Sequence, residues 1–251
     1  MNAYLLSHNG LGDNITMISA IRFLTQFYQK IFFICKDRNK ENVKLFFNES
    51  VVVLPFNQNN EFTECSDIIK NVDIKDDILI CGFHKTYLTS RINNPKLLEY
   101  KKNNDYKIRF SFIKKFYEDI GLDLSIYYNY FDISSSLTSN KLYQEISHYK
   151  IAFFHTQSSD GEINIENIIS SFKSKSEYIV ICANKNVYKL EEEEKFSIAA
   201  KYVNEKIAYY IDIIKNADVI HVIDSCFTCI VYPLQCTNKL IASECVIHPR
   251  N

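Results

Sequence analysis

The chain has 251 residues, of which 47% are hydrophobic and 24% charged, the composition of an ordinary globular protein with one or two domains. Its 29 basic and 30 acidic residues nearly cancel, so no strong overall field would draw it to nucleic acid or to an anionic membrane. The sequence contains no apolar segment of membrane-spanning length, and its amino terminus lacks the basic region of a signal peptide. Eight cysteines lie mostly in apolar runs, which is typical of reduced core residues and favours a cytoplasmic location.

The amino-terminal segment predicts a strand, a glycine loop, a helix and a second strand. Residues 3–7 form a short apolar run, Gly10 and Gly12 follow it, apolar residues then recur at helical spacing, and residues 31–35 form another apolar run. This order is that of a βαβ unit, whose two strands are parallel. Further strands are predicted at 51–54, 78–81 and 127–133, and a helix at 106–121.

A second alternation follows the Ser/Thr-rich stretch at 134–139. Strands are predicted at 151–154, 178–182, 219–223 and 240–242, and helices at 163–172, 191–203, 207–217 and 226–234. We therefore expect an α/β fold with two Rossmann-like, doubly wound parallel-sheet domains, at 1–137 and 150–251. Residues 138–149 form the expected linker, although the helix-like segment 141–149 belongs either to that linker or to the start of the second domain.

The loop at Gly10 and Gly12 allows two interpretations. A glycine loop between a strand and a helix is typical of anion or nucleotide binding, and Asp37 lies where an NAD enzyme keeps its ribose-binding acid. However, Ile15 occupies the position of the third small residue, and the charge of Asp13 would repel a pyrophosphate. At a helix N-terminus Asp13 stays ionised near neutral pH, so it can either cap the helix or accept a proton from a sugar hydroxyl.

Three short segments together resemble the lipopolysaccharide heptosyltransferases, which are glycosyltransferases of the two-Rossmann-domain (GT-B) type. The segment 211–234 reads IDIIKNADVIHVIDSCFTCIVYPL and is similar to the donor-site strand, turn and helix of that family. In it, Lys215, Ala217 and Asp218 precede the predicted strand, and Asp224 and Ser225 open the helix. The loop from Gly10 to Asp13 resembles the family's amino-terminal Gly-Asp motif, and IAFFHTQSSD at 151–160 resembles its first carboxyl-domain strand and loop.

The resemblance implies a GT-B glycosyltransferase whose two domains face a cleft. The second domain would bind a nucleotide-sugar, and the first would bind a glycan or other hydroxyl acceptor. It implies that Asp13 is the general base and that sugar transfer inverts the anomeric carbon without a metal or a cofactor. The donor-binding residues would be His155, Ser158, Ser159, Lys185, Asp224, Ser225, Cys226 and Phe227, and the acceptor-binding residues would be His8, Asn9, Gly10, Gly12 and His84. The alternative for His155, His8 and His84 is an ordinary strand-end or loop position without a ligand.

The sequence also departs from the family. Cys226 and Cys229 stand where the family has Gly and His, and the loop after the first strand of the second domain carries no basic residue, so Lys185 would have to supply the cation. A nucleotide-sugar-binding protein without activity is therefore one alternative, and an NAD-dependent oxidoreductase is another. The pair Cys226 and Cys229 also forms a Cys-x-x-Cys motif, which could be redox-active or, with Cys236, Cys245 and His248, could bind zinc.

Overall fold

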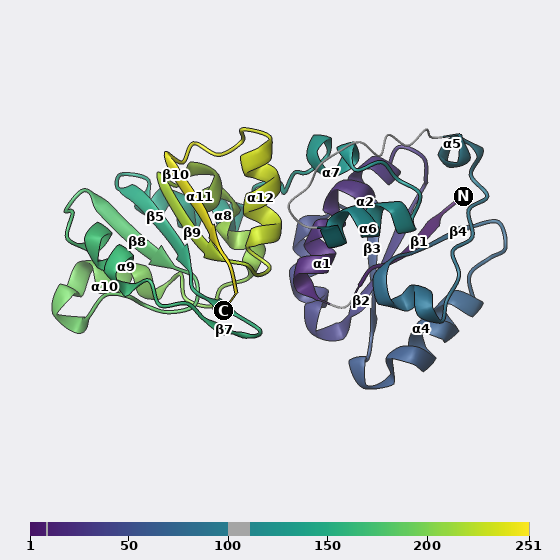
Figure 1. The fold of residues 1–251 in the computed structure, drawn as a ribbon, viewed down its shortest axis with the longest axis horizontal. Helices are drawn as coiled ribbons and strands as arrows, with labels where there is room; N and C mark the ends of the chain where they lie inside the picture. Colours follow the sequence, from purple (N-terminus) through teal and green to yellow (C-terminus); the bar gives the residue numbers. More distant parts are fainter. Residues whose placement is uncertain (9, 100–110, 251) are drawn as a thin grey trace. The chain divides into compact units, whose positions relative to one another are not determined.

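The computed structural model describes residues 1–8, 10–99 and 111–250 (Figure 1). The chain divides into two compact units, Met1–Asp132 and Ile133–Asn251. Each unit is built on one four-stranded sheet in which all neighbouring strands are parallel. This confirms an α/β fold with a parallel sheet in each half of the chain. No helix in the described part of the chain is long and apolar enough to cross a membrane.

The sheet of the first unit has the strand order β3-β2-β1-β4. Its strands are β1 (Ala3–Leu6), β2 (Ile31–Lys36), β3 (Val51–Phe56) and β4 (Asp77–Ile80). Its helices are α1 (Leu11–Thr16), α2 (Ile18–Leu24), α3 (Lys40–Val43), α4 (Glu61–Lys70), α5 (Pro95–Leu98), α6 (Ser111–Asp119) and α7 (Ser125–Asn129), with 3-10 turns η1 (Asp37–Asn39), η2 (Lys44–Phe46), η3 (Gln58–Asn60) and η4 (Gly82–Thr86). The chain moves outward from β1 to β3 and returns to β4 on the other side of β1. The loops after β1 and β4 therefore meet at the topological switch point, where open α/β sheets bind ligands.

Two layers of helices bury the sheet of the first unit. Because the β1–β2 and β3–β4 crossovers run in opposite directions and both are right-handed, α1 and α2 cover one face and α4 covers the other. Cys65 of α4 and the nearby Val72 pack against Leu6, Ile34 and Ile80 of the sheet. In the opposite layer, the Tyr117 hydroxyl of α6 donates to the Thr16 carbonyl of α1, and the Ser19 hydroxyl of α2 donates to the Tyr127 carbonyl of α7.

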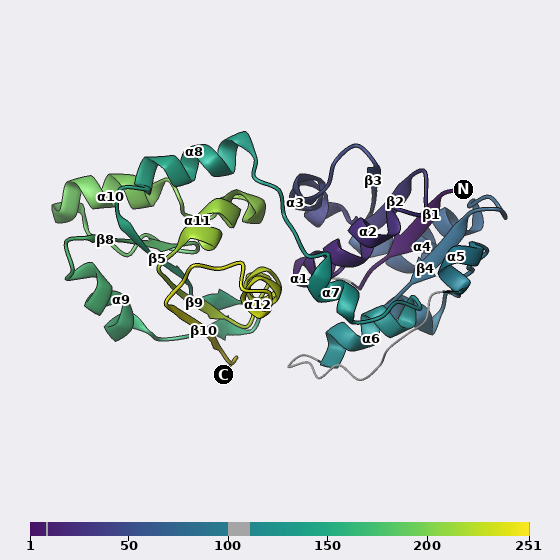
Figure 2. The same ribbon diagram turned by 90° about the horizontal axis from the view of Figure 1, so that it is seen from above.

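The sheet of the second unit has the order β10-β9-β5-β8, so its switch point lies between β5 and β9. Its strands are β5 (Lys150–His155), β8 (Tyr178–Cys182), β9 (Val219–Ile223) and β10 (Glu244–His248), and a hairpin of β6 (Gln157–Ser158) and β7 (Gly161–Glu162) follows β5. Its helices are α8 (Leu137–Ile146), α9 (Glu166–Lys173), α10 (Glu193–Ala200), α11 (Ile211–Asn216) and α12 (Thr228–Cys236), with 3-10 turns η5 (Leu190–Glu192) and η6 (Ile207–Tyr210). Figure 2 shows α9 on one side of this sheet and α8, α10 and α11 on the other.

The structure corrects two predicted strands. Residues 127–133 do not form a strand, because the carboxylate of Asp123 accepts a hydrogen bond of 2.7 Å from the Ser125 amide and starts the short helix α7. The last strand is β10, Glu244–His248, rather than 240–242. The first residues of the helix predicted at 106–121 lie outside the described residues, and the helix is described from Ser111 onward.

Residues 138–149, the expected linker, belong to the second unit. Most of them lie in α8, whose first turn is capped by Ser136. Ser139 is fully buried, and its hydroxyl donates a hydrogen bond of 2.6 Å to the carboxylate of Asp212 on α11. The helix therefore opens the second unit, as one of the two alternatives predicted, and the boundary between the units falls after Asp132.

Candidate functional site

The glycine loop after β1 places a carboxylate at the start of α1. The amide of Gly10 donates a hydrogen bond of 2.7 Å to Oδ2 of Asp13, the third residue of the helix. A Cβ on residue 10 would lie 2.9 Å from that oxygen, so glycine allows the carboxylate to approach the backbone. Gly12 lies within α1, where its carbonyl accepts from Thr16. Asp13 thus caps the helix, and a carboxylate with several lone-pair sites can still accept a second proton donor.

A histidine joins the loops at the switch point of the first unit. The amide of Phe83, in the turn after β4, donates a hydrogen bond of 2.9 Å to Nδ1 of His8, in the loop after β1. Because the amide is the donor, Nδ1 carries no proton and the neutral ring keeps its proton on Nε2. Gly82 has φ +66°, and a Cβ there would lie 2.7 Å from Nδ1 of His8. A side chain at residue 82 would therefore displace this contact.

Asp119 of α6 anchors the same turn, a role that no sequence motif indicated. Its Oδ2 accepts a hydrogen bond of 2.9 Å from the Gly82 amide, and its Oδ1 lies 3.0 Å from Lys85 and 3.3 Å from Lys115. Burial opposes ionisation of Asp119, but the Gly82 amide and the two ammonium groups outweigh it and hold its pKa below the usual value. The carboxylate therefore stays charged and fixes the position of η4.

His84, predicted to contact the acceptor, is fully buried. Its Nδ1 lies 2.7 Å from the hydroxyl of Tyr87, and burial lowers the pKa of His84 to about 4, although Glu61 acts in the opposite direction. Contact with an acceptor would require η4 to rearrange, whereas the neighbouring Phe83 is exposed. Asn9, also predicted to bind the acceptor, lies outside the described residues.

The second unit brings together two of the predicted donor-binding residues at its own switch point. His155 ends β5, Ser225 follows β9, and the Ser225 hydroxyl lies 3.1 Å from Nδ1 of His155. The ring of Phe227 packs 4.5 Å from the His155 ring, and its amide donates a hydrogen bond of 3.3 Å to the Ser225 hydroxyl. Burial lowers the pKa of His155 to about 4, so the imidazole is neutral at physiological pH.

The turn that contains Ser225 leads directly into α12. The Thr228 amide donates to the Ser225 carbonyl at 3.0 Å, and the helix runs on to Cys236. The Ser225 amide donates to the Thr228 hydroxyl at 3.3 Å, so the amides of this turn already bond within the loop. The start of a helix carries partial positive charge, and an anionic group at this edge would compete for these amides. The Asp224 amide is held by the His248 carbonyl at 2.9 Å, which ties this loop to the end of β10.

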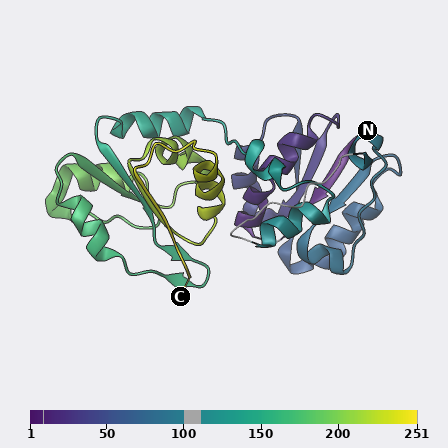
Figure 3. The same cartoon turned by 45° about the horizontal axis from the view of Figure 1, so that its top comes forward.

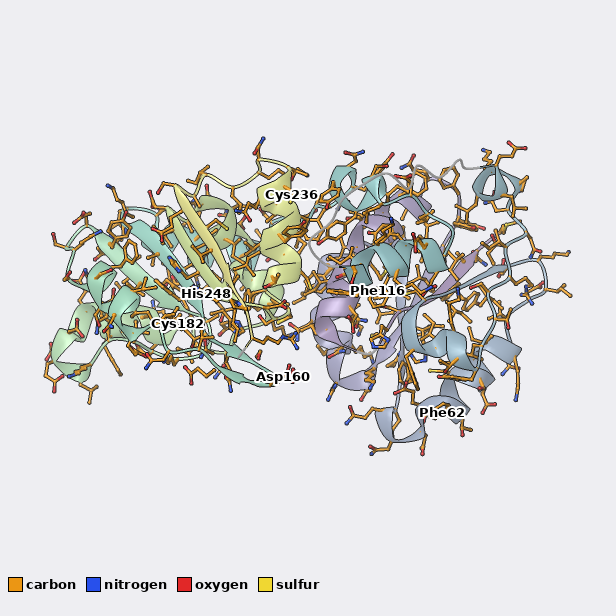
Figure 4. All side chains as sticks on the ribbon, viewed as in Figure 1. Phe62, Phe116, Asp160, Cys182, Cys236 and His248 are labelled. Carbon is orange, nitrogen blue, oxygen red and sulfur yellow. The ribbon has the colours of Figure 1, made fainter. Side chains whose placement is uncertain are left out.

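The Cys-x-x-Cys motif lies at the start of the same helix. Cys226 is half-buried and burial raises its pKa to about 11, so its thiol is protonated at neutral pH. Cys229 is buried against the Ser225 carbonyl, and Cys236 is exposed at the far end of the helix (Figure 4). Across the described ranges, no cluster of three or more His, Cys, Asp or Glu side chains is arranged to hold a metal ion. This geometry favours a structural role for the motif.

The hairpin after β5 carries Ser158 and Ser159, two further predicted donor-binding residues. The Ser158 hydroxyl accepts from the Asp160 amide at 3.2 Å, and the Ser159 hydroxyl donates to the Asp160 carboxylate at 3.2 Å. Arg250, which follows β10, lies 2.5 Å from that carboxylate and donates to the Asp224 carbonyl at 2.7 Å. Figures 1 and 3 show the end of β10 beside this hairpin. Arg250 thus places a cation at the carboxyl edge of the sheet, and no sequence motif indicated it.

Lys185, the predicted compensating cation, is already paired with two carboxylates. Its Nζ lies 2.9 Å from Glu162 and 2.7 Å from Glu166. Burial opposes the charge on Lys185, but the two carboxylates outweigh it and raise the pKa of the lysine. A donor phosphate would have to compete with them for this ammonium group, so the predicted role of Lys185 stays a prediction.

Part of the resembling segment lies away from this edge. Lys215 donates to the Ile133 carbonyl at 2.9 Å, and the Asp218 carboxylate accepts from the Ile151 amide at 2.8 Å. Asp218 directly precedes β9, and its bond reaches the amino end of β5, at the edge opposite Ser225 and His155. Lys215 lies in α11, and its bond ties that helix to the first residue of the second unit. Neither contact involves the loops of the candidate site.

No protein-family model matches this sequence, and no curated protein matches it. Solved structures do resemble the chain. Escherichia coli ADP-heptose lipopolysaccharide heptosyltransferase II is 9% identical with a TM-score of 0.58, and the likeness covers 98% of this chain and 90% of that one. A family 9 glycosyl transferase from Veillonella parvula is 10% identical with a TM-score of 0.57, covering 99% and 86% of the two chains. E. coli heptosyltransferase WaaC, solved with ADP, is 10% identical with a TM-score of 0.51, covering 93% and 84%. The predicted resemblance is thus confirmed for the fold, which this chain shares with these glycosyltransferases over nearly its whole length.

Proposed function

We propose that the protein is a glycosyltransferase that moves a sugar from a nucleotide-sugar donor to a hydroxyl acceptor. The observation that carries this proposal is the pairing of His155 and Ser225, 3.1 Å apart, at the β5/β9 switch point and at the start of α12. This edge offers helix amides, a hydroxyl and a neutral imidazole, groups that can bind a diphosphate. The whole-chain likeness to solved heptosyltransferases supports the same chemistry.

In the proposed reaction an acceptor hydroxyl attacks the anomeric carbon of the donor from the side opposite the phosphate. The new carbon–oxygen bond forms as the bond to the phosphate oxygen breaks, which inverts the anomeric centre and releases a nucleoside diphosphate. Asp13 takes the hydroxyl proton, because its carboxylate is held at the switch point of the first unit by the Gly10 amide. The leaving diphosphate gains negative charge, which the amides at the start of α12 stabilise in the second unit.

In the proposed reaction, protein groups rather than a divalent cation stabilise the leaving group. The guanidinium of Arg250 lies at the same edge of the sheet, bonded to the loop that carries Asp224. A protein of this kind would act in the cytoplasm, where nucleotide-sugars are made. None of the cysteines in the described ranges forms a disulfide, which fits a reducing compartment.

Thermal melting with UDP-, GDP-, ADP- and dTDP-sugars, and with NAD, tests the donor class. A ligand that binds only the folded state raises the melting temperature, by about 5 °C near saturation for a chain of this size. We expect one nucleotide-sugar to do so, and we expect release of the nucleoside diphosphate to continue in excess EDTA. If none of the nucleotide-sugars shifts the melting temperature, the proposal is wrong.

A nucleotide-sugar-binding protein without transferase activity is the second candidate. It is favoured by the pairing of Lys185 with two glutamates and by the Cys226 and Cys229 substitutions. Donor binding without turnover of any acceptor would support it. An NAD-dependent oxidoreductase is disfavoured, since the Gly10 amide that a pyrophosphate would need already binds Asp13.

A further inference from the structure

Three aromatic side chains form a cluster on the first unit, which we name the aromatic platform: the exposed Phe62 and Phe83 and the half-buried Tyr87. The ring centroids of Phe62 and Tyr87 are 4.6 Å apart, those of Phe62 and Phe83 are 5.9 Å apart, and those of Phe83 and Tyr87 are 6.1 Å apart. Phe62 is 57% exposed and Phe83 is 38% exposed. Large apolar side chains are seldom left together on a surface unless they bind something.

The aromatic platform begins at the switch point of the first unit. Phe83 lies in η4, and its amide is the donor to His8, which sits in the same loop as Asp13. Its ring also packs at 6.4 Å against the His8 ring. Phe62, on the first turn of α4, extends the row of rings away from His8 and is exposed at the surface (Figure 4). A ligand on the platform would therefore lie beside the loop that carries the proposed base.

Ion pairs lie beside the aromatic platform. Lys85 lies in the same turn, and it shares the buried carboxylate of Asp119 with Lys115, so two ammonium groups contact one carboxylate. Lys36 lies 3.2 Å from Glu61, the residue before Phe62. The three rings themselves carry no charge, so they suit a ligand with a flat apolar side.

We propose that the aromatic platform binds a saccharide, the acceptor of the reaction, an inference that rests on the proposed function of the chain. The carbon–hydrogen bonds on one side of a pyranose ring carry partial positive charge and pack against the negative face of an aromatic ring. The saccharide lies across Phe62 and Phe83, and its terminal hydroxyl reaches the switch point at His8 and Asp13.

Saturation-transfer NMR on the intact chain tests this site, with lactose, maltotriose, cellotriose and chitotriose as neutral probes. We expect aromatic protons to transfer saturation to the ring protons of at least one of these probes. Phe62→Ala or Phe83→Ala should weaken binding about tenfold, whereas Phe62→Tyr should retain it. Ile74→Ala removes a side chain that is 76% exposed near the amino end of β4 and should change nothing.

The same variants separate this inference from the proposed function. Phe62→Ala should leave the melting-temperature shift by the nucleotide-sugar unchanged, because Phe62 belongs to the other unit from Ser225. If no nucleotide-sugar binds but a neutral saccharide still depends on Phe62, the transferase proposal fails and the saccharide site stands.

Two results would overturn the saccharide site. They are the absence of saturation transfer to every neutral probe, and equal binding by Phe62→Ala and Ile74→Ala. Sedimentation with phosphatidylcholine–phosphatidylglycerol vesicles provides a further check. Binding to vesicles that is lost in Phe62→Ala, without saccharide binding, would make the platform a membrane contact instead.

Discussion

The two switch points are built alike but carry different chemistry. In each unit a histidine at or just after the end of the central strand bonds to the loop beyond the neighbouring strand: His8 to the Phe83 amide, and His155 to the Ser225 hydroxyl. The first loop also holds the carboxylate of Asp13 at the start of a six-residue helix. The second places a hydroxyl at the start of a nine-residue helix.

This difference suits the two similar switch points to opposite steps of the proposed reaction. A carboxylate suits a proton that must be removed, while helix amides with a neutral imidazole suit negative charge that must be stabilised. The two histidines also differ in what they can do. His8 accepts from an amide that can only donate, whereas the partner of His155 is a hydroxyl that can donate or accept. The switch point of the second unit can therefore exchange hydrogen bonds when a ligand binds.

The largest expected effect is that of Asp13→Asn. Asparagine can still accept from the Gly10 amide but cannot take a proton, so transfer should slow by about 100-fold or more. The melting-temperature shift by the nucleotide-sugar should be unchanged. Asp73→Asn, in an exposed turn before β4, is the matched control and should transfer at the parent rate. An Asp13→Asn protein with parental turnover would show that the first switch point supplies no base.

Gly82→Ala should have the next largest effect, and it acts on stability. The residue has φ +66°, and the new Cβ would lie 2.7 Å from His8. We therefore expect the free energy of unfolding to fall by about 2 kcal/mol. Urea denaturation measures this change, with Thr86→Ala in the same turn as the control. If Gly82→Ala and Thr86→Ala unfold at the same urea concentration, the link between the two loops is not a stable part of the fold.

Ser225→Ala should weaken donor binding and leave saccharide binding unchanged. It removes the hydroxyl that contacts His155 and the Phe227 amide, and one hydrogen bond is worth about 1 kcal/mol, or roughly fivefold in affinity. Calorimetric titration with the donor measures this, and Ser243→Ala, whose hydroxyl bonds to Asp218 at the other edge of the sheet, is the control. If both variants lost the same donor affinity, the donor would not bind at this loop.

The smallest effect at neutral pH concerns two buried histidines, His84 and His155. Burial lowers the pKa of each to about 4, whereas the pKa of an unfolded histidine is about 6.5. Between these values the unfolded chain binds more protons, so stability is full above about pH 6.5 and falls as the pH is lowered toward 4. Melting curves and an NMR titration of the imidazole protons measure both effects. Titration of either ring near pH 6.5 would contradict the neutral state assigned to it.

The sequence predicted most of the sheet and part of the site. Buried strands such as β8 and β9 are unbroken apolar runs, so their bounds follow from the pattern alone. The pairing of His155 with Ser225 could also be anticipated, because His155 ends β5 and Ser225 follows the neighbouring parallel strand β9, and the carboxyl ends of these strands share one edge.

Long-range contacts could not be predicted in this way. Asp119 bonds to an amide 37 residues away, and Arg250 bonds to a carboxylate 90 residues away, and neither belongs to a recognisable motif. Composition likewise does not distinguish the exposed Phe62 from a core phenylalanine such as Phe33. The pairing of Lys185 depends on glutamates brought close by the hairpin and by α9, which only the fold reveals.

The exposed thiol at the end of α12 offers a means to observe the loop that carries Ser225 directly. Cys236 is exposed, whereas Cys226 and Cys245 are half-buried and the remaining five cysteines are buried. A maleimide fluorophore should therefore attach to Cys236 first, most readily at mildly alkaline pH because burial raises the pKa of this thiol. The dye would sit at the opposite end of the helix from Ser225, so its emission could report ligand binding on the native sequence without altering the loop.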